Sequence, residues 1–483
     1  MAFGPHVPPL AALLVWIPIG VFLFYRYPVR IALLVNFVGG WAVLPTANFT
    51  PTASPFPYWI MGACLPGGYF VTKATVTGLA AILGILRFDR ARLERFRPTA
   101  WDLPMIVWCA APLISGAANV SYHGMLWAGL RGGAYQVLAW GVPYLMGRLY
   151  FSDNASLTLA ARAFAIAGLC YLPICVVELY TGPQFYTFVY GYQPFRWQGA
   201  ERYFGFRPVG FLEDGNQLGI WMAAATLCAA GLWKQGKVRR VLGLRTVWVA
   251  GLLLYTTILC QSAGSIIILL CLLPLVLISK LSFRRGVVIA CALLVICFAG
   301  FRLTNVISLR QIVESNRIAR SAASFLANTG RESFGWRLGQ DERHIRTALA
   351  TPVLGSGQWD WWKNGEGRPW SLWLLAFGMY GGIGLLALET VQFLPVIAAV
   401  WFPPEPDNPK DIRVTLGLGP ASRDDGLRLG LAAAILLAAI DNLMNGDMIL
   451  PLLLAIGGMS VWKVDKLSRR LYQSAAVMSR RGA

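Results

Sequence analysis

The segment from Arg207 to Asn216 places charged and amide side chains where an aromatic-rich stretch enters an apolar run. It contains Arg207, Glu213, Asp214 and Asn216. Such groups are costly at the mouth of a membrane bundle unless they pair or line a water-filled cavity. A guanidinium there could hold an anionic ligand, and a carboxylate could accept a proton. The plainer interpretation is a helix N-terminus whose carboxylates interact with the helix dipole.

A second group of basic residues lies in a charged stretch between residues 303 and 370. Guanidinium groups can donate to two phosphate oxygens at once, which suits an anionic ligand. His344 is a candidate general base at neutral pH, although a single histidine often serves only as a hydrogen-bond partner. The alternative is an amphipathic helix over about 331–350 that presents its arginines to lipid head groups or solvent. The arginines in question are Arg331, Arg337, Arg343 and Arg346.

Two other cations lie within or beside apolar runs. Arg131, next to Gly132, is expected to face the bundle interior, where it could bind phosphate or pair with Glu178 or Asp214. Lys73 lies near the end of a run, from which its ammonium could extend to the surface in a structural role.

Composition places these residues in a membrane protein. Of 483 residues, 56% are hydrophobic and only 13% are charged, and the mean hydropathy is +0.55. No soluble domain has enough interior to bury so much apolar surface. Because segments in hydrocarbon must satisfy their own backbone groups, we expect an all-α, polytopic transmembrane helix bundle with about 12–13 spans.

The net charge of +19 has a topological explanation rather than a nucleic-acid partner, because basic residues concentrate in cytoplasmic loops. Placing the basic clusters in the cytoplasm makes the charged loop extracytoplasmic. The chain then divides into an N-terminal bundle (1–302), a loop domain (303–370) and C-terminal helices with a basic tail (371–483). The nine cysteines lie mostly in apolar runs without metal-ligand spacing, as small core residues do. Neither a metal nor another cofactor is expected. The clusters are Arg87, Arg90, Arg92, Arg95 and Arg97; Lys234, Lys237, Arg239 and Arg240; Lys280, Arg284 and Arg285; and Lys463, Lys466, Arg469 and Arg470.

Several short motifs resemble those of one family. The chain between about residues 100 and 465 resembles the O-antigen ligase and O-antigen polymerase superfamily. The motifs are Arg207-x-x-Gly210-Phe211 followed by Asn216, Gly330-Arg331 with Trp336, Pro352-x-Leu354-Gly355-x-Gly357, and Asp441-Asn442 through Asp447.

The resemblance implies a metal-independent, inverting glycosyltransferase of surface polysaccharide (O-antigen or exopolysaccharide) biosynthesis. It would act at the outer face of the bacterial inner membrane on an undecaprenyl pyrophosphate-linked oligosaccharide, with membrane lipids and other polysaccharide-assembly proteins as its further expected partners. Arg207, and with it Arg331 and Arg337, would hold the pyrophosphate. Whether the protein would be a polymerase or a ligase stays open.

One departure from the family leaves the catalytic base open. Family ligases commonly carry a His-Asn pair where this chain reads Arg368-Pro369-Trp370-Ser371. His344, Glu213 or Asp214 could serve instead. Two functions from other classes also remain: a transporter or flippase of an anionic lipid-linked sugar, and a catalytically silent structural subunit.

Overall fold

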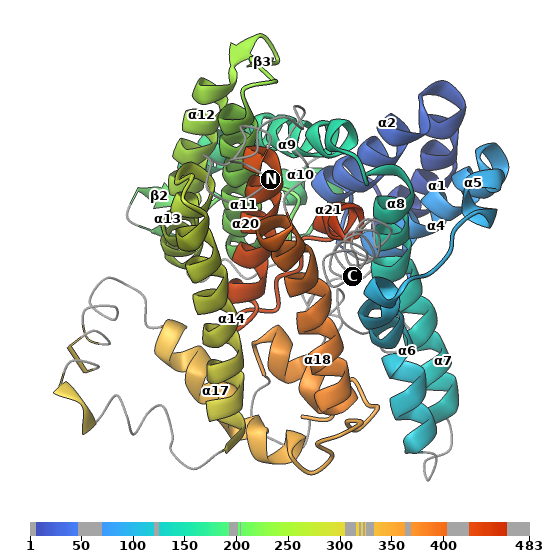
Figure 1. Ribbon diagram of the computed structural model, residues 1–483, viewed down its shortest axis with the longest axis vertical. Coiled ribbons are helices and arrows are strands. Elements are labelled where there is room, and N and C mark those ends of the chain that lie inside the picture. Colours follow the sequence, from blue (N-terminus) through green and yellow to red (C-terminus); the bar gives the residue numbers. More distant parts are fainter. Residues whose placement is uncertain are drawn as a thin grey trace, which may run out of the picture.

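The protein is a helical bundle with two small hairpins (Figure 1). The computed structural model describes residues 6–46, 70–119, 125–192, 201–202, 204–304, 333–362, 369–402 and 425–460, with isolated positions between 315 and 324. The N-terminal helical elements are α1 (Pro9–Arg26), α2 (Val29–Leu34), η1 (Val35–Gly39), α3 (Gly40–Val43), α4 (Lys73–Phe88), α5 (Arg90–Glu94), η4 (Ala100–Asp102), α6 (Leu103–Ala118), α7 (Met125–Gln136), η5 (Val137–Gly141), α8 (Val142–Tyr150), α9 (Asn154–Thr181) and α10 (Phe185–Tyr190). The later helices are α11 (Gly215–Gln235), α12 (Thr246–Leu259), α13 (Ala263–Leu277), α14 (Leu281–Thr304), α17 (Ser333–Ala348), α18 (Leu372–Trp401), α20 (Asp425–Asp441) and α21 (Leu452–Met459). The hairpins pair β1 (Glu201–Arg202) with β2 (Gly205–Phe206), and β3 (Arg240–Val241) with β4 (Leu244–Arg245).

The helical class and the membrane class are as the sequence predicts. Among the described residues, five helices are long and apolar enough to cross a membrane, and three shorter apolar helices accompany them. Large apolar side chains such as Leu386 and Ile296 are exposed on the outside of the bundle, as they are in proteins surrounded by lipid. The number of spans and the side on which the 303–370 loop lies stay predictions.

Helix α11 is the central element. All of its residues are buried except Asn216, Trp233 and Lys234, because α9, α12, α13 and α20 pack around it. Small residues allow these close contacts: a Cβ atom on Gly231 would lie only 3.0 Å from the Cα of Gly430 in α20. At 1.5 Å per residue the helix is about 30 Å long, so its two ends are separated by about the thickness of a bilayer core.

The Gly355-x-Gly357 motif has a structural role in holding a break in α18. Gly381 has φ +64° and ψ −164° inside that helix, which frees backbone groups on either side. The motif supplies partners: the Gly357 amide donates to the Met379 carbonyl at 2.9 Å, and the Gly382 amide donates to the Pro352 carbonyl at 2.7 Å. Broken helices persist in membranes only where such partners satisfy the backbone.

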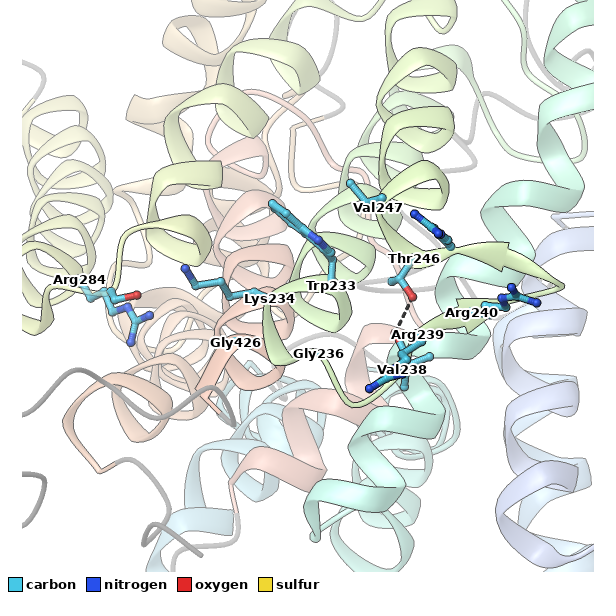
Figure 2. Close-up of a pocket in the computed structure, with 12 residues that line it drawn as sticks. Trp233, Lys234, Gly236, Val238, Arg239, Arg240, Thr246, Val247, Arg284 and Gly426 are labelled. Atoms are coloured by element: carbon cyan, nitrogen blue, oxygen red, sulfur yellow. Dashed lines mark hydrogen bonds between the residues drawn. The ribbon is translucent and has the colours of Figure 1, made fainter. Parts of the chain in front are cut away.

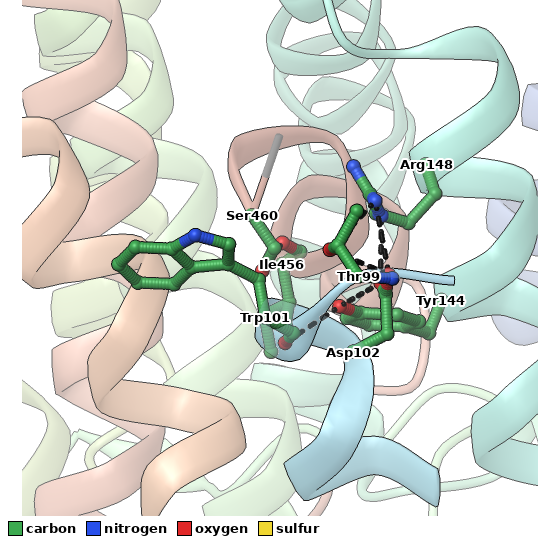
Figure 3. Close-up of polar contacts among 7 residues, drawn as sticks. All are labelled: Thr99, Trp101, Asp102, Tyr144, Arg148, Ile456 and Ser460. Atoms are coloured by element: carbon green, nitrogen blue, oxygen red, sulfur yellow. Dashed lines mark hydrogen bonds and ion pairs between the residues drawn. The ribbon is translucent and has the colours of Figure 1, made fainter. Parts of the chain in front are cut away.

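A buried polar network joins the start of α6 to α8 (Figure 3). The Asp102 carboxylate accepts from the Arg148 guanidinium at 2.7 and 3.0 Å, from the Tyr144 hydroxyl at 2.9 Å and from the Thr99 amide at 2.7 Å. Both side chains of the ion pair are buried, with exposed fractions of 3% and 8%. Both carboxylate oxygens are hydrogen-bonded, so removal of either partner of the ion pair would leave a buried charge without compensation.

Candidate functional site

Arg207 follows the β1–β2 hairpin and lies over the N-terminus of α11. Its Nη2 atom donates to Oδ1 of Asn216 at 2.6 Å, and its Nε atom donates to the Cys260 carbonyl at 3.3 Å. Gly215 makes this position possible, because a Cβ atom there would lie 2.5 Å from Nε of Arg207. Arg207 and Asn216, two of the residues predicted for the site, are thus hydrogen-bonded to each other.

Asp214 and Glu213 have different environments. Asp214 is the N-cap of α11, since its Oδ1 atom accepts from the Asn216 and Gln217 amides, both at 2.8 Å. The helix N-terminus interpretation is therefore confirmed for Asp214. The Glu213 carboxylate is also buried, yet its Oε2 atom has no hydrogen-bond partner among the described residues. Burial raises the pKa of Glu213 to about 7, and the positive charge of Lys73 opposes that rise.

Lys73 does not extend to the surface, so that prediction was wrong. Its side chain is buried, and its ammonium lies 4.2 Å from the centroid of the Trp41 ring. A cation over an indole face is stabilised by the ring quadrupole, which partly replaces the lost hydration. The ammonium is also close enough to Glu213 to act on its charge.

Arg337 reaches the same region from α17. Its Nη1 atom donates to Oδ1 of Asn445, and the guanidinium lies 5.5 Å from the centroid of the Trp370 ring. Nδ2 of Asn445 in turn donates to Oδ1 of Asp441 at 2.7 Å. The arginine of α17 is thereby tied to the connection between α20 and α21. The predicted helix over about 331–350 is confirmed as α17, with Arg337 turned inward and Arg346 exposed.

Arg207 and Arg337 belong to a group of charged side chains that act on one another electrostatically. We call this group the arginine–carboxylate cluster. Burial lowers the pKa of Arg207 to about 10; the negative charge of Asp214 opposes this shift, whereas Arg202 and Arg337 add to it. Burial also raises the pKa of Asp447 well above its ordinary value, and Asp214 is the carboxylate that adds most to that rise. The cluster consists of Arg202, Arg207 and Arg337 with Glu213, Asp214, Asp441 and Asp447.

The cluster carries buried acceptor atoms that its own side chains do not satisfy. Oε2 of Glu213, Oδ2 of Asp441 and Oδ2 of Asp447 have no hydrogen-bond partner in the described part of the chain. Buried polar atoms of this kind need a proton, water or a ligand. These oxygens can therefore accept a hydrogen bond or a proton, and the guanidinium groups of the cluster are the donors that an anionic ligand would use.

The other predicted residues lie elsewhere. His344 is buried in α17, where its ring is perpendicular to that of Trp361 at 6.2 Å and near-perpendicular to that of Trp362 at 6.5 Å. Burial and then the charge of Arg343 lower the pKa of His344, which favours the neutral imidazole. Arg331 lies outside the described residues.

Arg131 does not face the bundle interior, contrary to the sequence prediction. It is exposed on α7, and its guanidinium lies 5.0 Å from the centroid of the Trp127 ring. Glu178, its expected partner, instead accepts hydrogen bonds from the backbone amides of Phe185, Val209 and Gly210. The role of Arg131 in binding stays a prediction.

Sequence reasoning missed four members of this environment. Lys73 was interpreted as structural, and Asp441, Asn445 and Asp447 were used only as parts of a resemblance. The available signal was the density of carboxylates and amides between 441 and 447, next to apolar helices. Among the described residues no group of three or more His, Cys, Asp or Glu side chains is arranged to hold a metal ion.

No protein-family model, curated protein or solved structure matches this chain.

Proposed function

We propose that this protein is an O-antigen ligase- or polymerase-like membrane glycosyltransferase that joins lipid-linked saccharide units. The observation that supports it is the convergence of Arg207 and Arg337, from a hairpin and from a distant helix, beside unsatisfied carboxylates. Guanidinium groups donate to phosphate oxygens in pairs, so two of them in one region suit a pyrophosphate group. The donor would be an undecaprenyl pyrophosphate-linked oligosaccharide, bound at the outer face of a bacterial inner membrane.

The proposed reaction is a single displacement. An acceptor hydroxyl attacks the anomeric carbon of the donor, the new glycosidic C–O bond forms, and the bond from that carbon to the pyrophosphate oxygen breaks. Negative charge develops on the departing pyrophosphate, where the fixed charges of Arg207 and Arg337 stabilise it. The hydroxyl proton passes to a carboxylate of the cluster.

Glu213 fits the role of proton acceptor better than the other two candidates. Its pKa of about 7 suits transfer near neutral pH, and its Oε2 atom makes no hydrogen bond to another described group. Asp214 already uses one oxygen to cap α11. His344 packs against Trp361 and Trp362, and the charge that acts on it is that of Arg343, which is not a member of the cluster.

The test uses purified protein and an undecaprenyl pyrophosphate-linked oligosaccharide, with Arg207→Ala and Arg337→Ala compared with Arg346→Ala. Arg346 is exposed on the same helix as Arg337, so it controls for loss of a positive charge on α17. We expect each of the first two variants to lose about 10²–10³-fold in product formation, as for removal of one donor that stabilises developing charge. Arg346→Ala should keep wild-type turnover.

Three outcomes would contradict the proposal. Retained product formation in Arg207→Ala would remove that residue from the mechanism. Translocation of the lipid-linked sugar without bond formation would identify a carrier. Copurification with a stoichiometric partner and no turnover would identify a structural subunit.

A further inference from the structure

A cavity of about 810 Å³ lies at the other end of α11, between the β3–β4 hairpin and the ends of α13, α14 and α20 (Figure 2). Figure 1 shows this hairpin at one end of the helical body and α17 at the opposite end. The cavity is about 30 Å from the arginine–carboxylate cluster along α11. Its cations are Lys234, Arg239, Arg240, Arg245 and Arg284.

The described residues that line this cavity carry charge of one sign. No described residue that lines it carries a carboxylate. Arg240 pairs directly with Arg245 across the β3–β4 hairpin, a placement of like charges that destabilises an isolated strand pair. Among the described residues, the side chains of Arg239, Arg240 and Arg245 make no hydrogen bond or ion pair.

Only two of the five cations have hydrogen bonds to the end of a helix that explain their positions. Nζ of Lys234 donates to the Leu277 carbonyl at 2.9 Å, and Nε of Arg284 donates to the Ile278 carbonyl at 2.9 Å. Both therefore compensate the negative C-terminal end of α13. The general preference for cations in cytoplasmic loops explains why basic residues occur here. It does not explain why two arginines oppose each other beside a cavity.

Helix α20 adds a further feature that favours an anion. Gly426, in its first turn, lines the cavity and packs so closely that a Cβ atom there would lie 2.9 Å from Cβ of Lys234. The first amides of a helix have no intrahelical acceptor, and the helix dipole favours negative charge at that end. The cavity thus combines the N-terminus of a 17-residue helix with five cationic side chains.

We propose that this cavity binds a phosphate-bearing ligand, either the head group of an anionic lipid or a soluble phosphorylated molecule. Arginine forks match phosphate oxygens in pairs, and the volume suits a head group or a small molecule. Such a ligand would remove the repulsion between Arg240 and Arg245. This site is separate from the proposed transferase centre, so either proposal can fail without the other.

The test measures binding to purified full-length protein in detergent, with two probes that separate the sources. Native mass spectrometry would count bound dioctanoyl phosphatidylglycerol, with dioctanoyl phosphatidylcholine as the reference lipid. Isothermal titration would measure inorganic pyrophosphate. The variant is Arg240→Ala with Arg245→Ala, and the matched control is Lys237→Ala with Lys280→Ala, which removes the same charge from exposed residues outside the cavity lining.

We expect the arginine variant to bind its probe about tenfold more weakly for each guanidinium removed, while the lysine control keeps wild-type affinity. A loss confined to phosphatidylglycerol would identify a lipid head group, and a loss for pyrophosphate would identify a soluble ligand. Arg207→Ala should leave this component of binding unchanged. Equal affinity of the wild type and the arginine variant for both probes, or an equal loss in the lysine control, would overturn the proposal.

Because Arg240 and Arg245 are exposed and repel each other, their replacement should not lower the unfolding temperature without probe. A thermal scan without ligand therefore separates loss of binding from loss of folding.

Discussion

The two ends of α11 use charge in different ways. At the N-terminus, Arg207 and Asp214 belong to a buried cluster of both signs, held by short hydrogen bonds. At the C-terminus, Arg240 and Arg245 are exposed and carry one sign, and their side chains make no hydrogen bond or ion pair with the described residues. The helix dipole alone would predict an acid at one end and a base at the other, which accounts for Asp214 and Lys234 but for little else.

Burial explains the contrast. A buried charge must be compensated by its neighbours or change its protonation, so the cluster near Arg207 shifts pKa values and can exchange a proton. Exposed cations are compensated by water and counterions, so they can bind and release an anion without reorganising the protein. This contrast is the reason that we propose bond chemistry at the first end and reversible binding at the second.

The largest expected effect at the N-terminal end of α11 is the loss of turnover when Glu213 is replaced. Because its carboxylate is protonated below a pKa of about 7, product formation should fall as the pH drops below 7 and reach a plateau above it. Glu213→Gln should lower turnover by about 10²–10⁴-fold and remove this dependence, as for loss of a general base. The measurement is the pH profile of turnover in both proteins.

The pH dependence of the free energy of unfolding gives a second test of Glu213, and its direction is opposite to that of turnover. Its pKa is raised above the ordinary value of 4.5 in the folded protein, so the unfolded state loses the proton first. The free energy of unfolding should therefore decline as the pH rises between about 4.5 and 7, and Glu213→Gln should remove that decline. An unchanged profile would mean that Glu213 does not titrate in this range.

An effect of intermediate size is expected in the polar network of Asp102 and Arg148, whose carboxylate oxygens are both hydrogen-bonded. Asp102→Ala leaves the Arg148 guanidinium buried without its carboxylate, so the free energy of unfolding should fall by about 3–5 kcal/mol. The exposed pair of Arg90 and Glu94 is the matched control, and Glu94→Ala should change stability by less than about 1 kcal/mol. Denaturant unfolding in detergent measures both. Equal effects would show that burial does not govern these charges.

The smallest effects concern the glycines at the two ends of α11. A Cβ atom in Gly215→Ala would collide with the Arg207 side chain, so we expect turnover to fall by about tenfold, or about 1.4 kcal/mol. Gly236 has φ +73°, and no atom lies within 4 Å of the place that a Cβ atom would take, so Gly236→Ala should cost about 1 kcal/mol of stability and leave turnover unchanged. Loss of turnover in Gly236→Ala would break the assignment of chemistry to the N-terminal end alone.

Part of the site could be predicted from local sequence. The segment from Arg207 to Asn216 is short, and the N-cap role of Asp214 follows from its position before α11. The helix that carries Arg337 was also predictable from its composition. The partners of these residues were not, because Asn445 and Lys73 reach the site only through packing between distant helices.

The errors have the same cause. Lys73 was expected at the surface and is buried, whereas Arg131 was expected in the interior and is exposed. An apolar run shows how far a residue lies from the ends of a membrane helix. It does not show which side of that helix contacts another helix. The orientation of a helix about its axis depends on its neighbours, and one sequence gives little information about that.

The sequence by itself determined the membrane class, the helical backbone and the positions at which charges interrupt apolar segments, because these follow from the cost of exposing polar backbone and side chains to hydrocarbon. Only the tertiary structure decided which charges meet. It brought Arg207, which follows the β1–β2 hairpin, close enough to Arg337 of α17 for their charges to interact, and it placed Arg240 and Arg245 against each other beside a cavity. Side-chain proximity across a bundle is set by packing rather than by distance along the chain.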